Sequence, residues 1–159
     1  MTEEISFTVP GLAPASWNGN SRVHWSKRHR DADEYGERVW LAGHRALYPG
    51  CRSKAPERMF YDWRNQQTVT GTTASPRVVF IPWTKAHLTL VQRACRPRDH
   101  DNFLASFKPG LDTLTTKGKR PLGIILDDTP ECLSIEVRTE RVKHKRDEAV
   151  VVTLRREGG

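Results

Sequence analysis

Two different periods of apolar and polar positions mark the first third of the chain. Residues 5–9 alternate apolar and polar side chains, and this period of two predicts a strand that ends at Pro10. From Ser26 to Leu47 apolar residues recur at helical spacing, which predicts an amphipathic helix with charged residues on its other side. These apolar residues are Tyr35, Val39, Ala42 and Ala46.

The middle of the chain has a weaker pattern. No sustained period runs from Tyr48 to Pro76, so we expect a long loop or a family-specific insertion there, at about residues 48–76. Two apolar runs follow, Arg77 to Trp83 and His87 to Gln92, and each predicts a strand. The short turn between them indicates a hairpin.

The helical period returns between Asn102 and Thr115. The apolar residues of this second predicted helix are Leu104, Phe107, Leu111 and Leu114. Pro109 removes a backbone donor inside the run, so we expect a kinked helix or two short helices that meet there. Strands are predicted over Leu133–Val137 and Ala149–Leu154. These elements indicate a single α+β (mixed α/β) domain over residues 1–159, with a small mixed sheet and two main helices.

The composition of the chain indicates what kind of partner it binds. The 159 residues suit one domain, and 26 basic against 19 acidic side chains give a net charge of +7, which favours a polyanion. No apolar run is long enough for a membrane span, and the acidic N-terminal residues do not fit a signal peptide. We therefore expect a soluble, cytoplasmic protein with no membrane partner.

Cysteine and histidine do not point to a metal site. The three cysteines stand far apart without a CxxC pair, and the six histidines are scattered. We interpret Cys51, Cys95 and Cys132 as reduced structural residues. No small-molecule cofactor is expected.

Four aspartates are the candidate catalytic groups. Asp99 and Asp101 follow the strand that ends at Gln92, and in an extended segment residues two apart point to the same side. Asp127 and Asp128 follow a second apolar run. Because carboxylate oxygens are the ligands that Mg²⁺ prefers, the two pairs predict a magnesium site. The alternative is that these short acidic motifs are helix caps and turns, which are their commoner uses.

Lys108 adds a cation to this candidate site. It stands two helical turns after Asp101, and Asp112 stands one turn further along. Two interpretations are equally open: Asp112 orients a functional lysine, or the two residues form a solvated ion pair. The stretch from Arg93 to Arg120 has seven lysines and arginines and three aspartates. A basic surface around a few acids suits an enzyme that binds phosphates and a metal ion.

Four segments match, in order, the motifs of one known family. They are Asn20-Ser-Arg-Val-His-Trp25, Asp99-His-Asp-Asn102, Lys108-Pro-Gly-Leu-Asp-Thr-Leu114 and Leu126-Asp-Asp-Thr-Pro130. In this order they resemble the RusA family of Holliday junction resolvases (crossover junction endodeoxyribonucleases), and its phage and prophage branch in particular. The resemblance covers roughly residues 5–30 and 77–155.

The resemblance implies a homodimeric, Mg²⁺-dependent endonuclease, with Mn²⁺ as a substitute metal, that nicks four-way DNA junctions symmetrically. Its setting would be recombination, repair or phage DNA processing in a bacterial cell. The essential carboxylates would be Asp99, Asp101 and Asp128, with Asp127 adjacent and secondary. Lys108 would be the functional lysine, which stabilises the charge of the transition state.

Basic residues outside the acidic motifs are the candidate DNA contacts. They cluster at the start of the first helix, around the second helix and between the last two strands. The full set is Arg22, His24, Lys27, Arg28, Arg30, Arg96, Arg98, Lys117, Lys119, Arg120, Lys143, Lys145 and Arg146. Trp17, Trp25 and Trp63 are candidates for stacking on unpaired bases, with core or dimer packing as the equal alternative.

Two other functions fit the same residues. A non-catalytic basic DNA-binding protein would use the aspartates as caps and turns. A structure-selective nuclease would act on flaps and other branched DNA.

Overall fold

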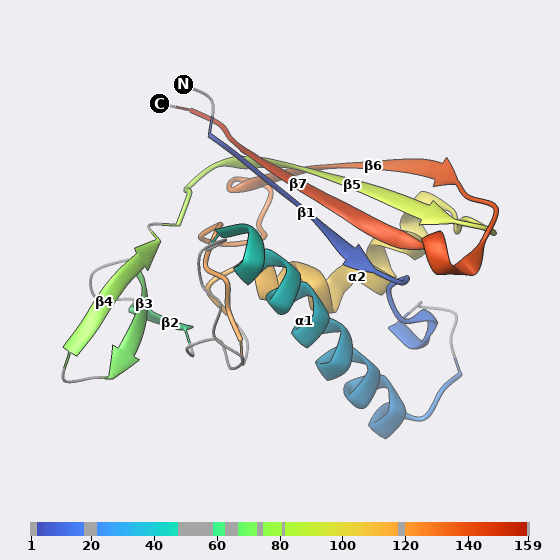
Figure 1. Ribbon diagram of the computed structural model, residues 1–159, viewed down its shortest axis with the longest axis horizontal. Helices are drawn as coiled ribbons and strands as arrows, with labels where there is room; N and C mark the ends of the chain where they lie inside the picture. The colour runs from blue at the N-terminus through green and yellow to red at the C-terminus, as the bar shows by residue number, and fades with distance from the viewer. Residues whose placement is uncertain are drawn as a thin grey trace.

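The computed structural model describes residues 3–17, 22–47, 59–62, 67–72, 75–80, 82–117 and 120–158. A four-stranded sheet forms one layer, and two helices lie against one face of it (Figure 1). The helices are α1 (Trp25–Leu47) and α2 (His100–Leu114). The strands are β1 (Glu4–Pro10), β5 (Ala86–Ala94), β6 (Leu133–Arg141) and β7 (Ala149–Arg156). Two short 3-10 helices are η1 (Ala15–Trp17) and η2 (Lys145–Asp147). The expected α+β class is confirmed.

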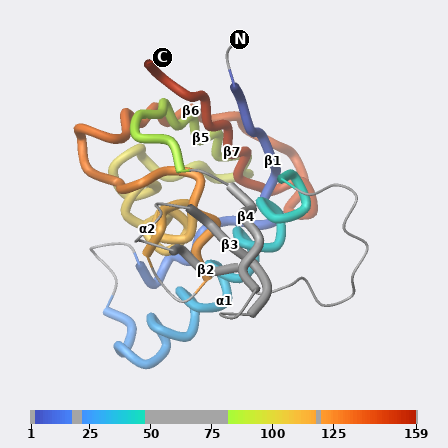
Figure 2. The backbone as a smooth tube through the Cα atoms, turned by 90° about the vertical axis from the view of Figure 1, so that its left-hand side faces the viewer, coloured from blue at the N-terminus to red at the C-terminus, as the bar shows by residue number. Residues whose placement is uncertain are grey.

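The sheet is mixed, and its strand order is β1-β7-β5-β6. β1 pairs antiparallel with β7, and β7 pairs antiparallel with β5. β5 and β6 are parallel, with Ala86 opposite Leu133 and Ala94 opposite Arg141. Figure 2 shows the same strand order across the molecule, with the helices below. Because parallel neighbours need a long crossover, the chain from β5 to β6 passes through the helical layer and includes α2.

Alternation along the strands decides which side chains the helices cover. On β5, buried positions alternate with half-buried ones from Ala86 to Ala94. The buried side chains of the sheet belong to one core with apolar residues of α1 and α2, among them Val39, Phe103 and Phe107. The helical layer is therefore fixed against the sheet, and α2 holds a defined place beneath it.

α2 runs unbroken through Pro109, so the expected alternative of two short helices is wrong. Leu111 and Leu114 are 6% and 0% exposed, and Phe107 is also fully buried. Burying such side chains stabilises the fold by roughly 1.5–3 kcal/mol each. Together they outweigh the cost of a helical proline, which is roughly 3 kcal/mol.

The middle of the chain forms a second sheet. β2 (Met59–Asp62), β3 (Gln67–Thr72) and β4 (Ser75–Phe80) are antiparallel, in the order β2-β3-β4. The expected loop is therefore wrong for these residues, and residues 48–58 lie outside the described part of the chain. Apolar residues stand side by side in β2 and β4, and β3 has a single aliphatic residue, so none of these strands shows an alternating pattern.

The expected hairpin between β4 and β5 is also wrong. β4 pairs with β3 in the small sheet. The reason lies in β5, which has β6 on one edge and β7 on the other. A strand can pair with only two neighbours, so β5 has no edge left for β4.

Candidate active site

A buried glutamine fixes the position of the chain between β5 and α2. Gln92 is 1% exposed. Its Nε2 donates to the carbonyl of Arg98 at 2.6 Å and to Thr139 Oγ1 at 3.1 Å. Its Oε1 accepts the backbone N–H of Arg98 at 3.2 Å. Sequence reasoning missed Gln92, and its one signal is a polar residue at a buried position of an alternating strand.

Asp99 caps the N-terminus of α2. Its Oδ1 accepts the backbone N–H of Asn102 at 2.9 Å, and its Oδ2 accepts from Asn102 Nδ2 at 2.7 Å. Asp101 already belongs to the helix. The expectation that these two carboxylates converge in an extended segment is therefore wrong, because residues two apart share a side in a strand and not in a helix.

Lys108 lies between two carboxylates. Its Nζ is 2.9 Å from Asp112 Oδ1 and 2.5 Å from Asp128 Oδ2. Partial burial is the largest single influence and lowers the pKa of Lys108, but hydrogen bonds to Asp128 and Asp112 outweigh it, and the pKa lies above its ordinary value. Lys108 is therefore a cation at neutral pH. The helical spacing of Lys108 and Asp112 predicts their pairing, whereas Asp128 comes close to Lys108 only in the folded protein.

Asp127 forms a second carboxylate–lysine pair beside the first. Its Oδ1 is 2.9 Å from Lys117 Nζ and accepts the backbone N–H of Asp128 at 2.8 Å. These hydrogen bonds lower the pKa of Asp127 below its ordinary value. Lys117, a predicted DNA contact, is thus bonded to one of the predicted metal ligands.

Asp101 and Lys108 line one open cavity of about 430 Å³. The other lining residues are mostly apolar: Trp17, Leu104, Ala105, Leu111 and Ile135. Asp101 and Lys108 are two helical turns apart, about 10 Å along the axis of α2. The structure therefore brings Asp101 to the cavity of Lys108, whose ammonium group also contacts Asp128.

The carboxylates offer oxygen ligands without forming a compact cluster. Across the described ranges, no group of three or more histidine, cysteine or acidic residues lies close enough to hold a metal ion. Mg²⁺ is often bound by one or two carboxylates together with water and a substrate phosphate. Asp101 and Asp128 are ligands of this chemical kind, but the described residues do not gather them into one site with a third ligand.

A second cavity of about 390 Å³ lies between α1 and α2. Its lining includes charged residues of both signs: Arg30, Asp33, Glu34, Glu37, Asp112, Lys117 and Arg120. Arg120, a predicted DNA contact, is 3.5 Å from Glu37. Two other candidates, Lys119 and Trp63, lie outside the described residues. The mixed lining makes this cavity a poor anion site.

Two basic segments meet at the end of the sheet where α2 begins. The backbone N–H of Val142 donates to the carbonyl of Ala94 at 3.1 Å, which joins the segment after β6 to the segment after β5. The exposed predicted DNA contacts of these segments are Arg96, Lys143, Lys145 and Arg146. Because they come from neighbouring segments, they can bind one stretch of phosphates together.

Arg98 differs from these exposed residues. Its Nη1 donates to the carbonyl of Ala13 at 2.8 Å, and burial lowers its pKa. Its backbone is bonded to Gln92. Arg98 therefore holds the loop after β1 against the start of α2, and its half-buried guanidinium is bonded within the protein.

The remaining predicted DNA contacts lie at the start of α1. Lys27 Nζ is 2.8 Å from Asp31 Oδ2, and the Arg28 guanidinium lies 5.1 Å from the centroid of the Trp17 ring. Trp25 is 67% exposed. The other exposed members of this group are Arg22, His24 and Arg30.

Within the described ranges, no helix is long and apolar enough to cross a membrane. Cys95 and Cys132 have free thiols, and Cys51 lies outside those ranges. The chain matches no protein-family model and no curated protein.

Proposed function

We propose that this protein is a divalent-metal-dependent endonuclease that cleaves four-way DNA junctions. The observation that carries the proposal is the position of Lys108: its ammonium group contacts two carboxylates, and the residue lines the same cavity as Asp101. A fixed cation close to carboxylates can bind a phosphate and a metal ion side by side. The motifs shared with RusA resolvases support the same substrate.

The cation and the carboxylates have separate parts in this proposal. Lys108 stays protonated and stabilises negative charge that develops on the scissile phosphate. Asp112 and Asp128 position its ammonium group. Asp101 and Asp128 would hold Mg²⁺ or Mn²⁺, and the bound ion would supply a water of lowered pKa as the attacking group. Asp99 would join them only after releasing Asn102.

DNA binding would rest on basic residues away from the cavity. The exposed side chains at the start of α1 and at the sheet end near α2 would contact phosphates. A homodimer fits the proposal, because a four-way junction has two equivalent strands to cut and a two-fold enzyme matches that symmetry.

The decisive experiment compares labelled four-way junction with linear, flap and fork DNA, in Mg²⁺ and in EDTA. We expect paired nicks in the junction that require Mg²⁺. Asp101→Asn should abolish these nicks and leave junction affinity nearly unchanged, because Asp101 is proposed to hold the metal ion. Asp147→Asn, an exposed charge-matched change in η2, should cleave like the parent protein. Nicks by Asp101→Asn at the parent rate would refute the assignment.

One observation favours a second candidate, a non-catalytic DNA-binding protein. Asp99 serves as a helix cap, and Asp127 is paired with a lysine. If the junction is bound and shifted but stays intact in Mg²⁺ and in Mn²⁺, this second function replaces the first. Preferred cutting of flaps or forks would instead identify a structure-selective nuclease.

A further inference from the structure

We propose that Trp25 and His29 form a track on which unpaired nucleobases stack, and that Trp17 joins this track to the cavity of Asp101 and Lys108. This inference rests on the proposed function in one respect, the nucleic-acid partner. It adds the part of the substrate that is recognised, namely bases that are not in a duplex.

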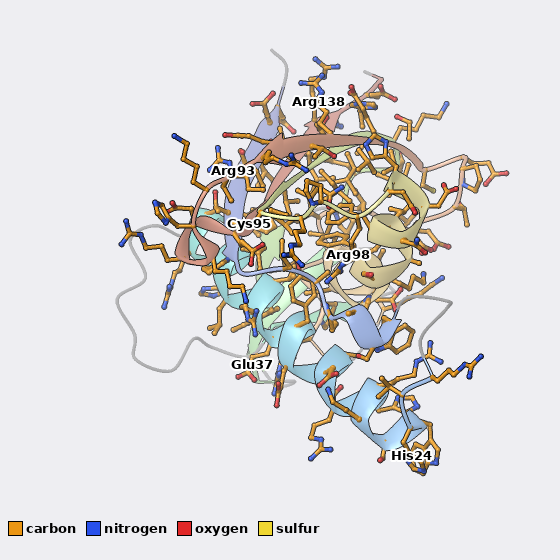
Figure 3. The ribbon with its side chains drawn as sticks, turned by 90° about the vertical axis from the view of Figure 1, so that its right-hand side faces the viewer. His24, Glu37, Arg93, Cys95, Arg98 and Arg138 are labelled. Atoms are coloured by element: carbon orange, nitrogen blue, oxygen red, sulfur yellow. The ribbon has the colours of Figure 1, made fainter. Side chains whose placement is uncertain are left out.

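Trp25 starts this track. At 67% it is the large apolar side chain that stands exposed among the described residues. Trp25 is the first residue of α1, and Figure 3 shows its neighbour His24 at the outer end of this helix. Burial of this indole would be favourable, so its exposure indicates a surface that a partner covers.

The rings around Trp25 are contiguous. The His24 and Trp25 ring centroids are 5.6 Å apart, and those of Trp25 and His29 are 5.8 Å apart. Trp25 and His29 are four residues apart on a helix, so they lie on one face. His29 in turn lies 6.5 Å from Trp17, edge to face. The rings therefore lead from the tip of α1 to η1.

Trp17 connects these rings to the candidate active site. Its Nε1 donates to the carbonyl of Arg28 at 2.8 Å, which ties η1 to the first turns of α1. On the other side, Trp17 lines the cavity of Asp101 and Lys108. A nucleotide stacked on the track would thus have its neighbours close to the proposed catalytic groups.

The charge around the track identifies the occupant. From Arg22 to Arg30 the chain has four basic residues and no acidic one. Aromatic rings among basic side chains are the surface that single-stranded nucleic acid uses, with bases on the rings and phosphates on the cations. A sugar or an apolar peptide has no negative charge that these basic side chains could bind. A second copy of this chain would bring the same positive charges against each other, which is unfavourable.

The test measures binding in EDTA, so that cleavage plays no part. Two junctions are compared by fluorescence anisotropy: one with unpaired thymidines at the crossover, and one with abasic spacers at the same positions. Both have the same number of phosphates. We expect the parent protein to bind the thymidine junction roughly tenfold more tightly, since stacking is lost with the base. Trp25→Ala should reduce the ratio to near one, and Trp25→Phe should keep most of it.

Lys27→Ala is the matched control, because Lys27 lies on the same helical turns and has no ring. It should weaken binding to both junctions equally and reduce the salt dependence. An unchanged ratio in Trp25→Ala, or no preference in the parent protein, would overturn the track. So would dissociation of a dimer by Trp25→Ala in sedimentation, since the rings would then be an interface between copies.

Failure of the track and failure of the nuclease give different results. Mg²⁺-dependent nicking without a thymidine preference would support the nuclease function and contradict the stacking track. A thymidine preference that depends on Trp25, without nicking of any substrate, would support the stacking track and contradict the nuclease function.

Discussion

The charge of Lys108 is set by its two acidic neighbours. Asp112 is one turn away on the same helix, whereas Asp128 comes from the segment that leads into β6. A lysine that serves as a general base needs a lowered pKa, and the contacts with these carboxylates raise it instead. Lys108 is therefore suited to electrostatic stabilisation and not to proton abstraction.

Replacing Lys108 tests this role. Lys108→Ala should slow junction cleavage by about 10²–10³-fold, the usual effect of removing one group that stabilises transition-state charge. Junction affinity, measured in EDTA, should change little, because one phosphate contact among many is lost. Lys85→Ala removes an exposed lysine elsewhere and serves as the control. Parent-like cleavage by Lys108→Ala would contradict the assignment.

His44 predicts a pH dependence of stability. It is 7% exposed, its ring lies 4.9 Å from the Trp40 ring, and burial lowers its pKa below the ordinary value of about 6.5. The unfolded chain therefore takes up this proton at a higher pH than the folded chain, and the stabilising contribution is lost as the pH falls below about 6.5. Urea unfolding of the parent and of His44→Phe between about pH 7.5 and 5.5 measures this. A drop of equal size in both proteins would exclude His44 as the cause.

Among the secondary-structure elements, α1 makes one very close contact with the segment after α2. A Cβ on Gly43 would lie 2.4 Å from Leu122 Cδ1 and 3.3 Å from the Phe7 ring. Leu122 is fully buried, and its backbone N–H donates to the carbonyl of Thr113 at 2.8 Å, so it has little freedom to move. The absence of a side chain at Gly43 thus sets how closely α1 packs here.

Gly43→Ala should lower the free energy of unfolding. Overpacking costs about 1–3 kcal/mol, and the gain in helix propensity offsets at most about 1 kcal/mol of it. Gly36→Ala is the control on the same helix: it has the same propensity gain, and its Cβ would meet Thr113 Oγ1 at 3.3 Å. Its stability should stay near that of the parent in urea unfolding. Equal losses in the two variants would show that the close approach to Leu122 is not what destabilises Gly43→Ala.

At the scale of the whole molecule, most of the exposed predicted DNA contacts among the described residues gather in two regions, and the candidate catalytic carboxylates lie at the start of α2 and in the segment before β6. One region is the start of α1, and the other is the sheet end near α2 (Figure 1). The cavity of Asp101 and Lys108 is lined by Trp17, which is bonded to the start of α1, and by Asp101 at the start of α2. The net charge of +7 therefore matters less for function than its distribution.

Salt titration tests this distribution. Junction affinity should fall steeply with salt, by a slope of about 0.9 for each neutralised phosphate on a log–log scale. Changing both Lys145 and Arg146 to alanine should reduce the slope by about two contacts. Arg155→Ala, on the sheet and away from both regions, should leave it unchanged. A flat response in the parent protein would argue against any polyanionic partner.

Long periodic segments made both helices predictable from the sequence, and contacts between distant segments were not predictable. The segment from Ser26 to Leu47 matches α1 closely. The pairing of β4 depends on β5 having both edges occupied, which no local pattern contains. The contact of Lys108 with Asp128 spans 20 residues and exists only because the chain folds back under the sheet. Asp99 lies before the helix, as predicted. Because α2 begins at His100, earlier than predicted, Asp101 lies inside the helix and does not share a side with Asp99.

The place of β6 at the edge of the sheet has a consequence for local opening. β6 is bonded to β5 alone in the main sheet, and the segment with Asp127 and Asp128 leads directly into it. An edge strand exchanges its amide hydrogens through partial openings that leave the core intact. Each such opening would loosen the segment that carries Asp128 while β1, β7 and β5 stay paired. Hydrogen exchange along β6 would therefore report how often the strand that follows Asp128 opens, at a free energy below that of global unfolding.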